Sequence, residues 1–520
     1  MEMPWKNPEF LRHTRRELRP VRVLIAIGVP LLLCVLLMLV MREGERDSFG
    51  HIRWNAYWDD LYATMLIVQG ILLAGWCAST CGHTISSERQ LKTFDFLRTT
   101  RLTSGELLLG SILGRPIVGF LIVGVTLPIT LLAGSAAGHP ILRVLSSVAV
   151  ILVVCLCFAF GATLFSMLTE KPRSGELIVL MLVYLWGVFT ISQNVGFLGW
   201  NSASPALAII PALMKLNGQD SYTSAGVTSF FGHGIPQAWM TVILYGTMAL
   251  WIGLMLVRNF KRDREEVRLL SRVQAMAFVL YINVIFLSQV SVASPAGNVY
   301  SMLNSLGISG KHIDLAHMMI TRTTSTFLGL NAAVFYLVGI AMLAPAGSLK
   351  TWFRERQRSF ASYWSEDAPP AAWMIVAALV AWTVLAGVTT YYTHRLPSSN
   401  WSLRTTGLRL AIILVYSIRD VVFLQWCAIT RMKSPLMKGT LLLSLYYFSA
   451  SMLAAFAQAV AQAPNSMVGY ALVTPAGAFG DVELMASLQG AGVQVGIIVL
   501  LLVAIRKRLV QKGNLVPAIA

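Results

Sequence analysis

The chain has 520 residues, of which 56% are hydrophobic and only 12% are charged. Soluble domains carry about twice that share of charged residues, and several apolar stretches reach about 20 residues, the length that crosses the hydrocarbon core of a bilayer. This composition excludes an ordinary soluble protein. The net charge of +17 must therefore reside in loops, where it reports membrane topology and not a nucleic-acid partner.

The first 22 residues form a basic leader ahead of the first apolar stretch. Asn7 suits a helix N-cap and Pro8 suits the first helical turn, so a helix is predicted to begin there. Its apolar residues would lie in the membrane interface while its arginines meet lipid phosphates. The two sets are Trp5, Phe10, Leu11 and Leu18, and Arg12, Arg15, Arg16 and Arg19. Any basic leader on the cytoplasmic face would give a comparable pattern, and that alternative stays open.

Twelve apolar stretches are predicted to span the membrane. They are 23–41, 61–81, 107–133, 144–168, 177–198, 236–257, 273–292, 323–345, 371–393, 407–429, 440–461 and 490–505. The first stretch is longer than the apolar core of a signal peptide and lacks a small-x-small cleavage site, so it is expected to stay as a span. Lys and Arg concentrate in the segments that lie inside if the N-terminus is inside, which places both termini in the cytoplasm. The predicted fold class is an all-α polytopic membrane protein.

A polar stretch, 85–114, lies between the second and third predicted spans. Charged residues recur there every three or four positions, and apolar residues fall between them at the spacing of an amphipathic helix. The charged set is Glu88, Arg89, Lys92, Asp95, Arg98 and Arg101, and the apolar set is Leu91, Phe94, Leu97 and Leu102. Thr103, followed three residues later by Glu106, forms a capping-box pattern, which predicts that a new helix begins there.

The stretch resembles the first cytoplasmic loop of ABC-2 type transporter permeases. In that family an E-R/K pair, a Thr, a leucine-rich turn and an L-S/T-x-x-E/I-L-L-x-G-K motif form the coupling helix and open the third span. The matching residues are Glu88 and Arg89, Thr93, Leu97, Thr100, Leu102 and Thr103, and Leu107 to Gly110. Lys92 stands where the family has Gly, Arg101 where it has Pro, and Ser111 where it has Lys. The basic leader is similar to the cytoplasmic elbow helix of the same permeases, and an ordinary solvated loop remains the alternative.

Weak internal repeats suggest a duplication. The sequence LKTF at 91–94 recurs as LKTW at 349–352, and three further matches follow in the same order at offsets near half the chain length. The prediction is a first six-helix half over 1–257, a charged cytoplasmic linker and elbow over 258–272, and a diverged second half of the same orientation over 273–520. A second coupling element is expected over 349–364, although an aromatic anchor in the membrane interface would look similar.

The resemblance implies a membrane-spanning permease subunit of an ATP-driven exporter in the plasma (inner) membrane. Two separate ATPase subunits per chain would dock on the two coupling elements and carry the ATP and Mg, while this chain would be no enzyme and bind no cofactor or metal. The lipid bilayer is a further partner, and the resemblance allows accessory transport subunits. The residues carried over as ATPase-coupling are Glu88, Arg89, Leu91, Thr93, Phe94, Leu97, Leu102, Leu349, Trp352, Phe353 and Arg354. In agreement, the chain contains no phosphate-binding G-x-x-x-x-G-K-[S/T] loop.

Three charged residues fall within predicted spans: Arg115, Arg419 and Asp420. Arg115 is expected to reach back to the cytoplasmic interface and stand in for the family lysine. Adjacent residues on a helix point about 100° apart, so Arg419 and Asp420 are each expected to find another partner. They mark either a structural ion pair, a contact between halves, or a surface that faces the substrate.

Two other classes of function are open. A secondary transporter of major-facilitator type would also have twelve spans in two like-oriented halves, but its G-x-x-x-D-R-x-G-R-R loop is missing here. A membrane glycosyltransferase rests only on the acidic pair Asp59 and Asp60. A metal site at Cys77, Cys81 and His83 has metal-ligand spacing but no fourth ligand nearby, which favours packing between spans.

Overall fold

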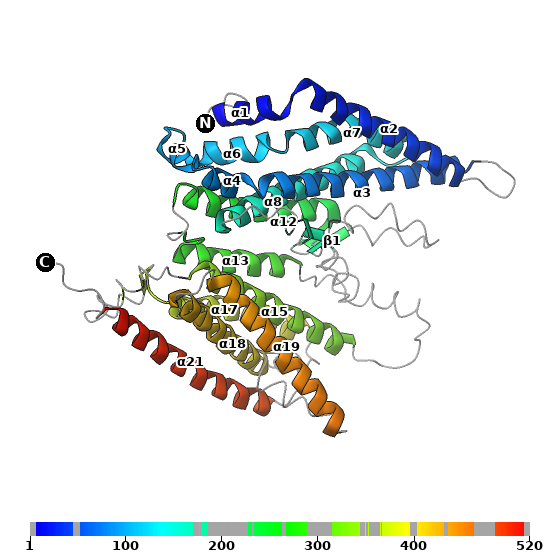
Figure 1. The fold of residues 1–520 in the computed structure, drawn as a ribbon. Coiled ribbons are helices and arrows are strands. Elements are labelled where there is room, and N and C mark those ends of the chain that lie inside the picture. Colours follow the sequence, from blue (N-terminus) through cyan, green and yellow to red (C-terminus); the bar gives the residue numbers. More distant parts are fainter. Residues whose placement is uncertain are drawn as a thin grey trace. The chain divides into compact units, whose positions relative to one another are not determined.

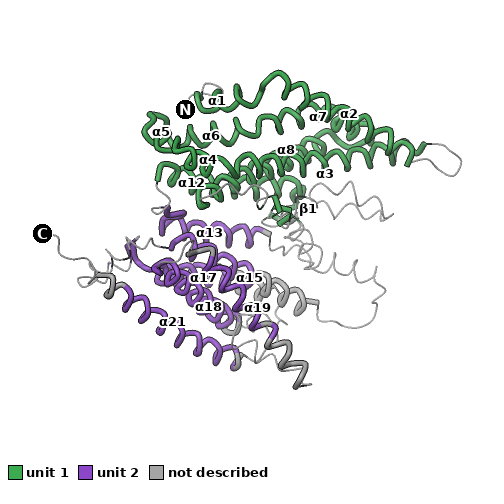
Figure 2. Tube along the Cα trace, viewed as in Figure 1, with its two compact units in different colours: residues 1–264 green, residues 265–520 purple. Residues whose placement is uncertain are grey.

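The computed structural model describes residues 7–44, 52–169, 227–230, 233–262, 267–289, 315–343, 367–395, 403–430, 435–461 and 484–513, with a few isolated positions between them. The chain divides into two compact units, residues 1–264 and 265–520 (Figure 2). The boundary falls inside the predicted linker. Most of the predicted span 177–198, most of the loop 199–226, the loop 464–483 and most of the element 349–364 lie outside the described residues.

The first unit is almost entirely helical (Figure 1). Its elements are α1 (Pro8–Glu17), α2 (Pro20–Gly44), α3 (Trp54–Cys81), α4 (Thr84–Gln90), α5 (Phe94–Thr99), α6 (Ser104–Gly114), α7 (Ile117–Ala136), α8 (Ile141–Leu168), β1 (Val227–Phe230), β2 (His233–Pro236) and α12 (Gln237–Asn259). α3 packs against α7 and α8, and α8 also packs against α12. α3 is therefore the most enclosed of the long helices of this unit, whereas α2 lies against α7 and α3 with most of its apolar surface open.

The second unit is helical throughout its described part. Its helices are α13 (Arg272–Gln289), α15 (Leu315–Ala341), α17 (Ala371–Arg395), α18 (Leu403–Ile429), α19 (Pro435–Ala461) and α21 (Leu484–Gly513). α18 is central, because it packs against α15, α17, α19 and α21.

Six stretches among the described residues are long and apolar enough to cross a membrane. They are Pro20–Gly44, Trp54–Gln90, Ile117–Ala136, Ile141–Leu168, Gln237–Asn259 and Ser487–Arg508. The chain is thus a mostly helical, multi-pass membrane protein. The total of twelve spans and the like orientation of two halves stay predictions.

The predicted third span, 107–133, is wrong as a single helix. α6 ends at Gly114 and α7 begins at Ile117, so the two are separated at Arg115 and Pro116. Proline has no amide hydrogen and its ring clashes with the preceding turn, which ends a helix. This interruption places Arg115 at the junction of α6 and α7 instead of inside a continuous helix.

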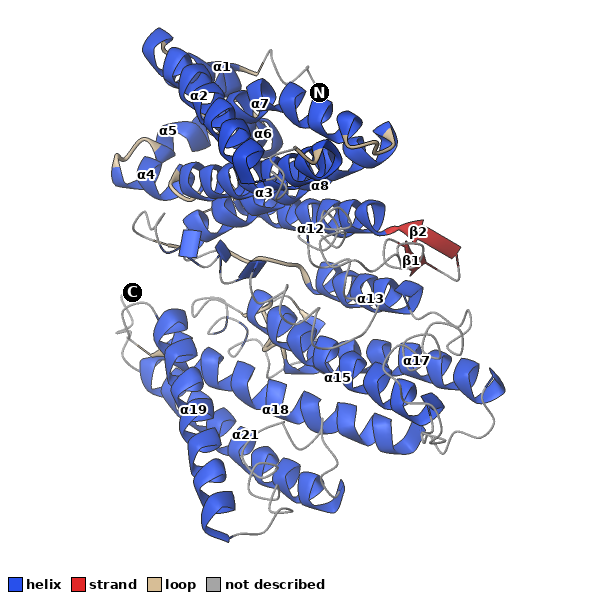
Figure 3. Ribbon diagram, turned by 90° about the vertical axis from the view of Figure 1, so that its right-hand side faces the viewer, coloured by secondary structure: helices blue, strands red, loops and turns tan. Residues whose placement is uncertain are grey.

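A two-stranded antiparallel hairpin is the exception to the all-α prediction. β1 and β2 pair in the register Val227 with Pro236 and Phe230 with His233, just before α12 (Figure 3). β-Branched residues such as Val227, Thr228 and Ile235 suit a strand, but four residues are too few to show a period from sequence.

Candidate functional site

The polar stretch after α3 folds as two short helices joined by a tight turn, not as one amphipathic helix. α4 ends at Gln90 and α5 begins at Phe94. Lys92 lies in the turn with φ +57°, the left-handed region, and it is the one non-glycine residue with a positive φ in the described part of the chain. Left-handed backbone favours glycine, because a Cβ crowds the following carbonyl there. Lys92 is also the position at which the resembling family has Gly.

Glu88 is the centre of the polar contacts in this segment. Its Oε1 accepts hydrogen bonds from Arg12 of α1 and from Arg115 after α6, each at 3.2 Å. Its Oε2 accepts from the hydroxyl of Thr93, whose amide also donates to the Glu88 carbonyl at 3.0 Å. One carboxylate therefore joins α1, α4, the turn and the α6–α7 junction. Arg115 was expected to reach the cytoplasmic interface, and in the structure its guanidinium meets this carboxylate.

Further contacts fix the segment to the ends of two long helices. Arg89 donates to the carbonyl of Met167 on α8 at 2.8 Å and lies over the ring of Phe94, 5.0 Å from its centroid. The hydroxyl of Ser166 accepts from two backbone amides of α4 at 3.0 Å. Phe94 in turn packs against Phe260, just after α12, with ring centroids 6.4 Å apart.

The residue after Phe260 adds a reciprocal pair of polar contacts. Arg98 donates to the carbonyl of Lys261 at 2.8 Å, and the Lys261 ammonium donates to the carbonyl of Thr100 at 3.2 Å. The C-terminal end of α12 is thereby held against α5. Leu97, on the same face of α5 as Phe94, is buried beside them.

The helix α1 docks on α6 through a groove of glycines. A Cβ at Gly110 would lie 2.8 Å from Cβ of Glu9 and 2.9 Å from the amide nitrogen of Phe10, and one at Gly114 would lie 2.9 Å from Cβ of His13. The absence of side chains at these two positions, one turn apart, lets the two helices approach closely. Asn7 completes the contact, since its side chain donates to the carbonyl of Glu106 at 2.6 Å.

Both helix starts follow the sequence predictions. Asn7 Oδ1 accepts from the amide of Glu9 at 2.9 Å, which confirms the N-cap of α1. Thr103 and Glu106 exchange both bonds of a capping box at the start of α6. The hydrogen bonds from the Thr103 backbone and hydroxyl lower the pKa of Glu106.

Glu9 is the carboxylate that α1 buries against α6. Its Oε1 lies 2.9 Å from Nε2 of His13 and 2.7 Å from a guanidinium nitrogen of Arg12. Burial opposes ionisation of Glu9, but the His13 hydrogen bond and the Arg12 charge outweigh it, so the pKa of Glu9 is lowered from its ordinary value. Arg12 therefore joins Glu9 to Glu88, which connects the docked α1 with α4.

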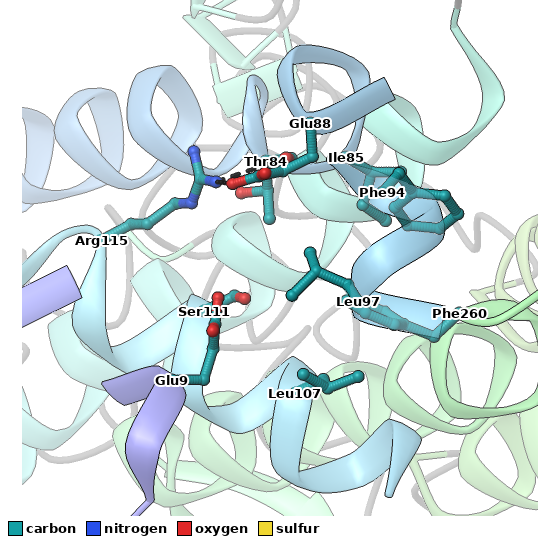
Figure 4. A pocket seen from close by; sticks show the side chains of 10 residues that line it. All are labelled: Glu9, Thr84, Ile85, Glu88, Phe94, Leu97, Leu107, Ser111, Arg115 and Phe260. Atoms are coloured by element: carbon teal, nitrogen blue, oxygen red, sulfur yellow. Dashed lines mark hydrogen bonds and ion pairs between the residues drawn. The ribbon is translucent and has the colours of Figure 1, made fainter. Parts of the chain in front are cut away.

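These elements enclose a narrow pocket, seen from close by in Figure 4. Arg115 points across it toward Glu88, with Phe94, Leu97 and Phe260 on the apolar side. The lining residues are Glu9, Thr84, Ile85, Glu88, Phe94, Leu97, Leu107, Ser111, Arg115 and Phe260. Ser111 and Arg115, one helical turn apart, thus face the same space.

The outer surface of the segment is apolar at two points. Leu91 is 71% exposed and Phe96 is 73% exposed, whereas Phe94 and Leu97 are buried and Leu102 is half-buried. The predicted apolar face is therefore divided: part of it anchors the segment, and Leu91 remains outside. Phe96 was missed by sequence reasoning, because it falls on the polar side of a helical pattern that the turn at Lys92 interrupts.

In the predicted coupling element of the second unit, Leu349 and Trp352 are buried, unlike the exposed Leu91 and Phe96 of the first unit. Leu349 is buried against Val422, Ile429 and Ile505, and Trp352 is also buried. Leu349 is therefore part of the hydrophobic core of the second unit. Phe353 and Arg354 lie outside the described residues.

Arg419 and Asp420 each find other partners, as expected, but they also pair with each other, which was not expected from their offset on the helix. Nη2 of Arg419 lies 2.6 Å from Oδ1 of Asp420, and Nε donates to the same oxygen at 2.7 Å. The side chain of arginine is long enough to fold back along the helix and overcome the 100° offset. The side chains are 5% and 0% exposed.

Residues from three other helices complete this network. Arg419 donates to Gln494 at 2.7 Å and to Tyr447 at 2.7 Å, while the hydroxyls of Tyr336 and Tyr447 both donate to Asp420 Oδ2. The pair is therefore satisfied inside the second unit, between α15, α18, α19 and α21. This arrangement favours the structural interpretation over a surface that faces a substrate.

The candidate acidic site at Asp59 and the candidate metal site at Cys77 and Cys81 consist of buried residues that contact their neighbours in the fold. Asp59 lies 2.9 Å from Nε2 of His139, and both side chains are mostly buried. Cys77 and Cys81 are fully buried free thiols on α3. Among the described residues, no three His, Cys, Asp or Glu side chains come together as a metal site would require.

Comparison of the chain with family models, curated proteins and solved structures finds no match.

Proposed function

We propose that this chain is the membrane-spanning permease subunit of an ATP-driven exporter of ABC-2 type, and that the segment 84–103 docks a separate ATPase subunit. The plasma membrane location, the cytoplasmic placement of both termini, and the second docking point at 349–364 belong to the same proposal. ATP and Mg would bind the partner, and closure of two ATPase subunits would drive substrate movement between two halves of the permease.

The observation that carries the proposal is a polar segment between two membrane-crossing helices. Hydrogen bonds hold it to α1, to α8 and to the end of α12, and its outer surface carries apolar side chains. Leu91 and Phe96 are the two large apolar side chains that the segment 84–103 exposes, and covering them with a partner would remove apolar surface from water and so favour docking. Glu88 and Arg89 form hydrogen bonds within the unit, so those two residues would act by positioning Leu91 and Phe96 for contact with the partner. The left-handed turn at Lys92 also gives a physical reason for the glycine of the resembling family.

The test is purification of the tagged full chain from its native cells in mild detergent, followed by measurement of vanadate-sensitive ATPase activity. The double variant Leu91→Asp and Phe96→Asp is expected to lose the co-purifying ATPase and its activity. The matched control is Ile141→Asp and Leu142→Asp, at the opposite end of α8 from its contact with α4, where the two side chains are 69% and 63% exposed. The control should retain the ATPase.

Two results would make the proposal wrong. A wild-type chain that purifies alone, with transport in vesicles that follows a proton gradient, would identify a secondary transporter instead. Equal loss of ATPase in the test and control variants would show that any exposed charge disrupts the complex, and that the segment 84–103 is not the docking surface.

A further inference from the structure

Three arginines at the corner between α1 and α2 have no partner among the residues that the structure describes. Five arginines occur from α1 to the first turn of α2, and two of them are neutralised: Arg12 by Glu9 and Glu88, and Arg22 by Glu17 at 2.7 Å. Arg15, Arg16 and Arg19 are exposed and make no ion pair or side-chain hydrogen bond to any residue that the structure describes.

The backbone holds these three residues close together. Arg15 and Arg16 lie in the last turn of α1, which ends at Glu17, and the carbonyl of Arg19 accepts the amide of Val23 at 3.0 Å in the first turn of α2. All three therefore occupy one corner, where α1 passes into α2 (Figure 1). The docking of α1 on α6 fixes the position of the corner, so the positive charge is concentrated on a preformed surface.

An apolar surface continues directly from this corner. Val21 is 70% exposed, Leu24 73% and Ile25 53%, on a helix that is long and apolar enough to cross the membrane. A molecule that contacts both features must have an anionic head and an apolar tail. Free phosphate would satisfy the arginines alone, and a soluble acidic protein would leave the apolar side chains in water.

We propose that Arg15, Arg16 and Arg19 bind the phosphate headgroup of an anionic phospholipid whose acyl chains lie along the first turns of α2. The guanidinium groups donate forked hydrogen bonds to the phosphate oxygens, and this geometry makes arginine a preferred ligand for phosphate. Arg12 is not part of this site, because its guanidinium is directed to Glu88 and Glu9. The proposal does not depend on the transport function or on an ATPase partner.

The test is native mass spectrometry of the full chain in a neutral detergent, titrated with phosphatidylglycerol or with phosphatidylcholine. The wild type is expected to bind one phosphatidylglycerol much more tightly than phosphatidylcholine. The triple variant Arg15→Gln, Arg16→Gln and Arg19→Gln is expected to weaken that step by about 100-fold, since each basic residue near an anionic surface contributes about 1 kcal/mol. Replacement of the same three residues by lysine, which keeps the charge, should retain most of the affinity.

A control with the same loss of charge separates a site from general attraction. The triple variant Arg506→Gln, Lys507→Gln and Arg508→Gln, near the end of α21 in the other unit, should still bind one phosphatidylglycerol with the affinity of the wild type. An equal loss in both triple variants would overturn the proposal, because non-specific attraction would then explain the binding. Competition by soluble glycerol phosphate at concentrations near those of the lipid would also overturn it, since the acyl chains would then contribute nothing.

Discussion

The role of Glu88 as the centre of the segment 84–103 can be tested by its replacement with glutamine. The change keeps the shape of the side chain and removes the charge shared by Arg12 and Arg115. Glu88 is 12% exposed and Arg115 is 14% exposed, so the loss leaves a nearly buried guanidinium without its counterion. A hydrogen bond to a charged group contributes about 1.5–3 kcal/mol and removal of one partner from a fully buried ion pair costs about 3–5 kcal/mol. For this partly buried pair we expect a cost of about 2–3 kcal/mol.

The cost should appear as local opening of the segment, which chymotrypsin can report by cleavage after Phe96 in the purified chain. If opening and closing are fast relative to cleavage, 2–3 kcal/mol raises the cleavage rate by about 30- to 150-fold. Arg12→Gln is the control: Arg12 is 46% exposed, so its loss should cost below about 1 kcal/mol, or at most about fivefold. A cleavage rate of Glu88→Gln within twofold of wild type would refute the assignment of Glu88 as the residue that holds the segment.

Three further predictions follow from the same structure. Lys92→Gly is expected to slow cleavage after Phe96 by about fivefold, because it removes about 1 kcal/mol of left-handed backbone strain, and faster cleavage would contradict this. Gly110→Ala is expected to lower the free energy of unfolding of the first unit by about 1–3 kcal/mol, because the new Cβ meets the backbone of α1. As a control, the new Cβ of Gly105→Ala meets nothing within 4 Å, so this change should leave the free energy of unfolding nearly unchanged. Asp420→Asn is expected to lower the free energy of unfolding of the second unit by about 3–5 kcal/mol, and the joint change Arg419→Met and Asp420→Leu should recover most of it; equal losses in both would argue against a structural pair.

The features that could be predicted from the sequence are those set by neighbours along the chain. The cap at Asn7 depends on the amide two residues later, and the capping box joins Thr103 to Glu106 across a single turn. Long apolar stretches likewise identify membrane helices because their length is fixed by the bilayer. The helix break at Pro116 was also visible in the sequence, but average hydropathy passes over a single proline.

The contacts of the site itself depend on residues far apart in the chain. Glu88 meets Arg12 across 76 positions and Arg115 across 27 positions, and no periodic pattern contains that information. The mutual pairing of Arg419 and Asp420 was missed for another reason, since helical geometry fixes the direction of Cβ but not the path of a long side chain. The exposure of Phe96 follows from the turn at Lys92, which shifts the face that α5 presents.

The contacts of the segment 84–103 with neighbouring helices determine which helices a docked partner would act on. The segment is bound to α1 through Glu88, to α8 through Arg89, and to the end of α12 through Phe94. A force applied at Leu91 or Phe96 would therefore reach the ends of α8 and α12, which are long and apolar enough to cross a membrane, together with α1. A flexible loop would dissipate such a force within itself, so under the proposed function the internal hydrogen bonds of this segment would suit it for mechanical coupling. Under the proposed function, Glu88 and Arg89 would matter for transport because they make the segment rigid, even if neither one touches the ATPase.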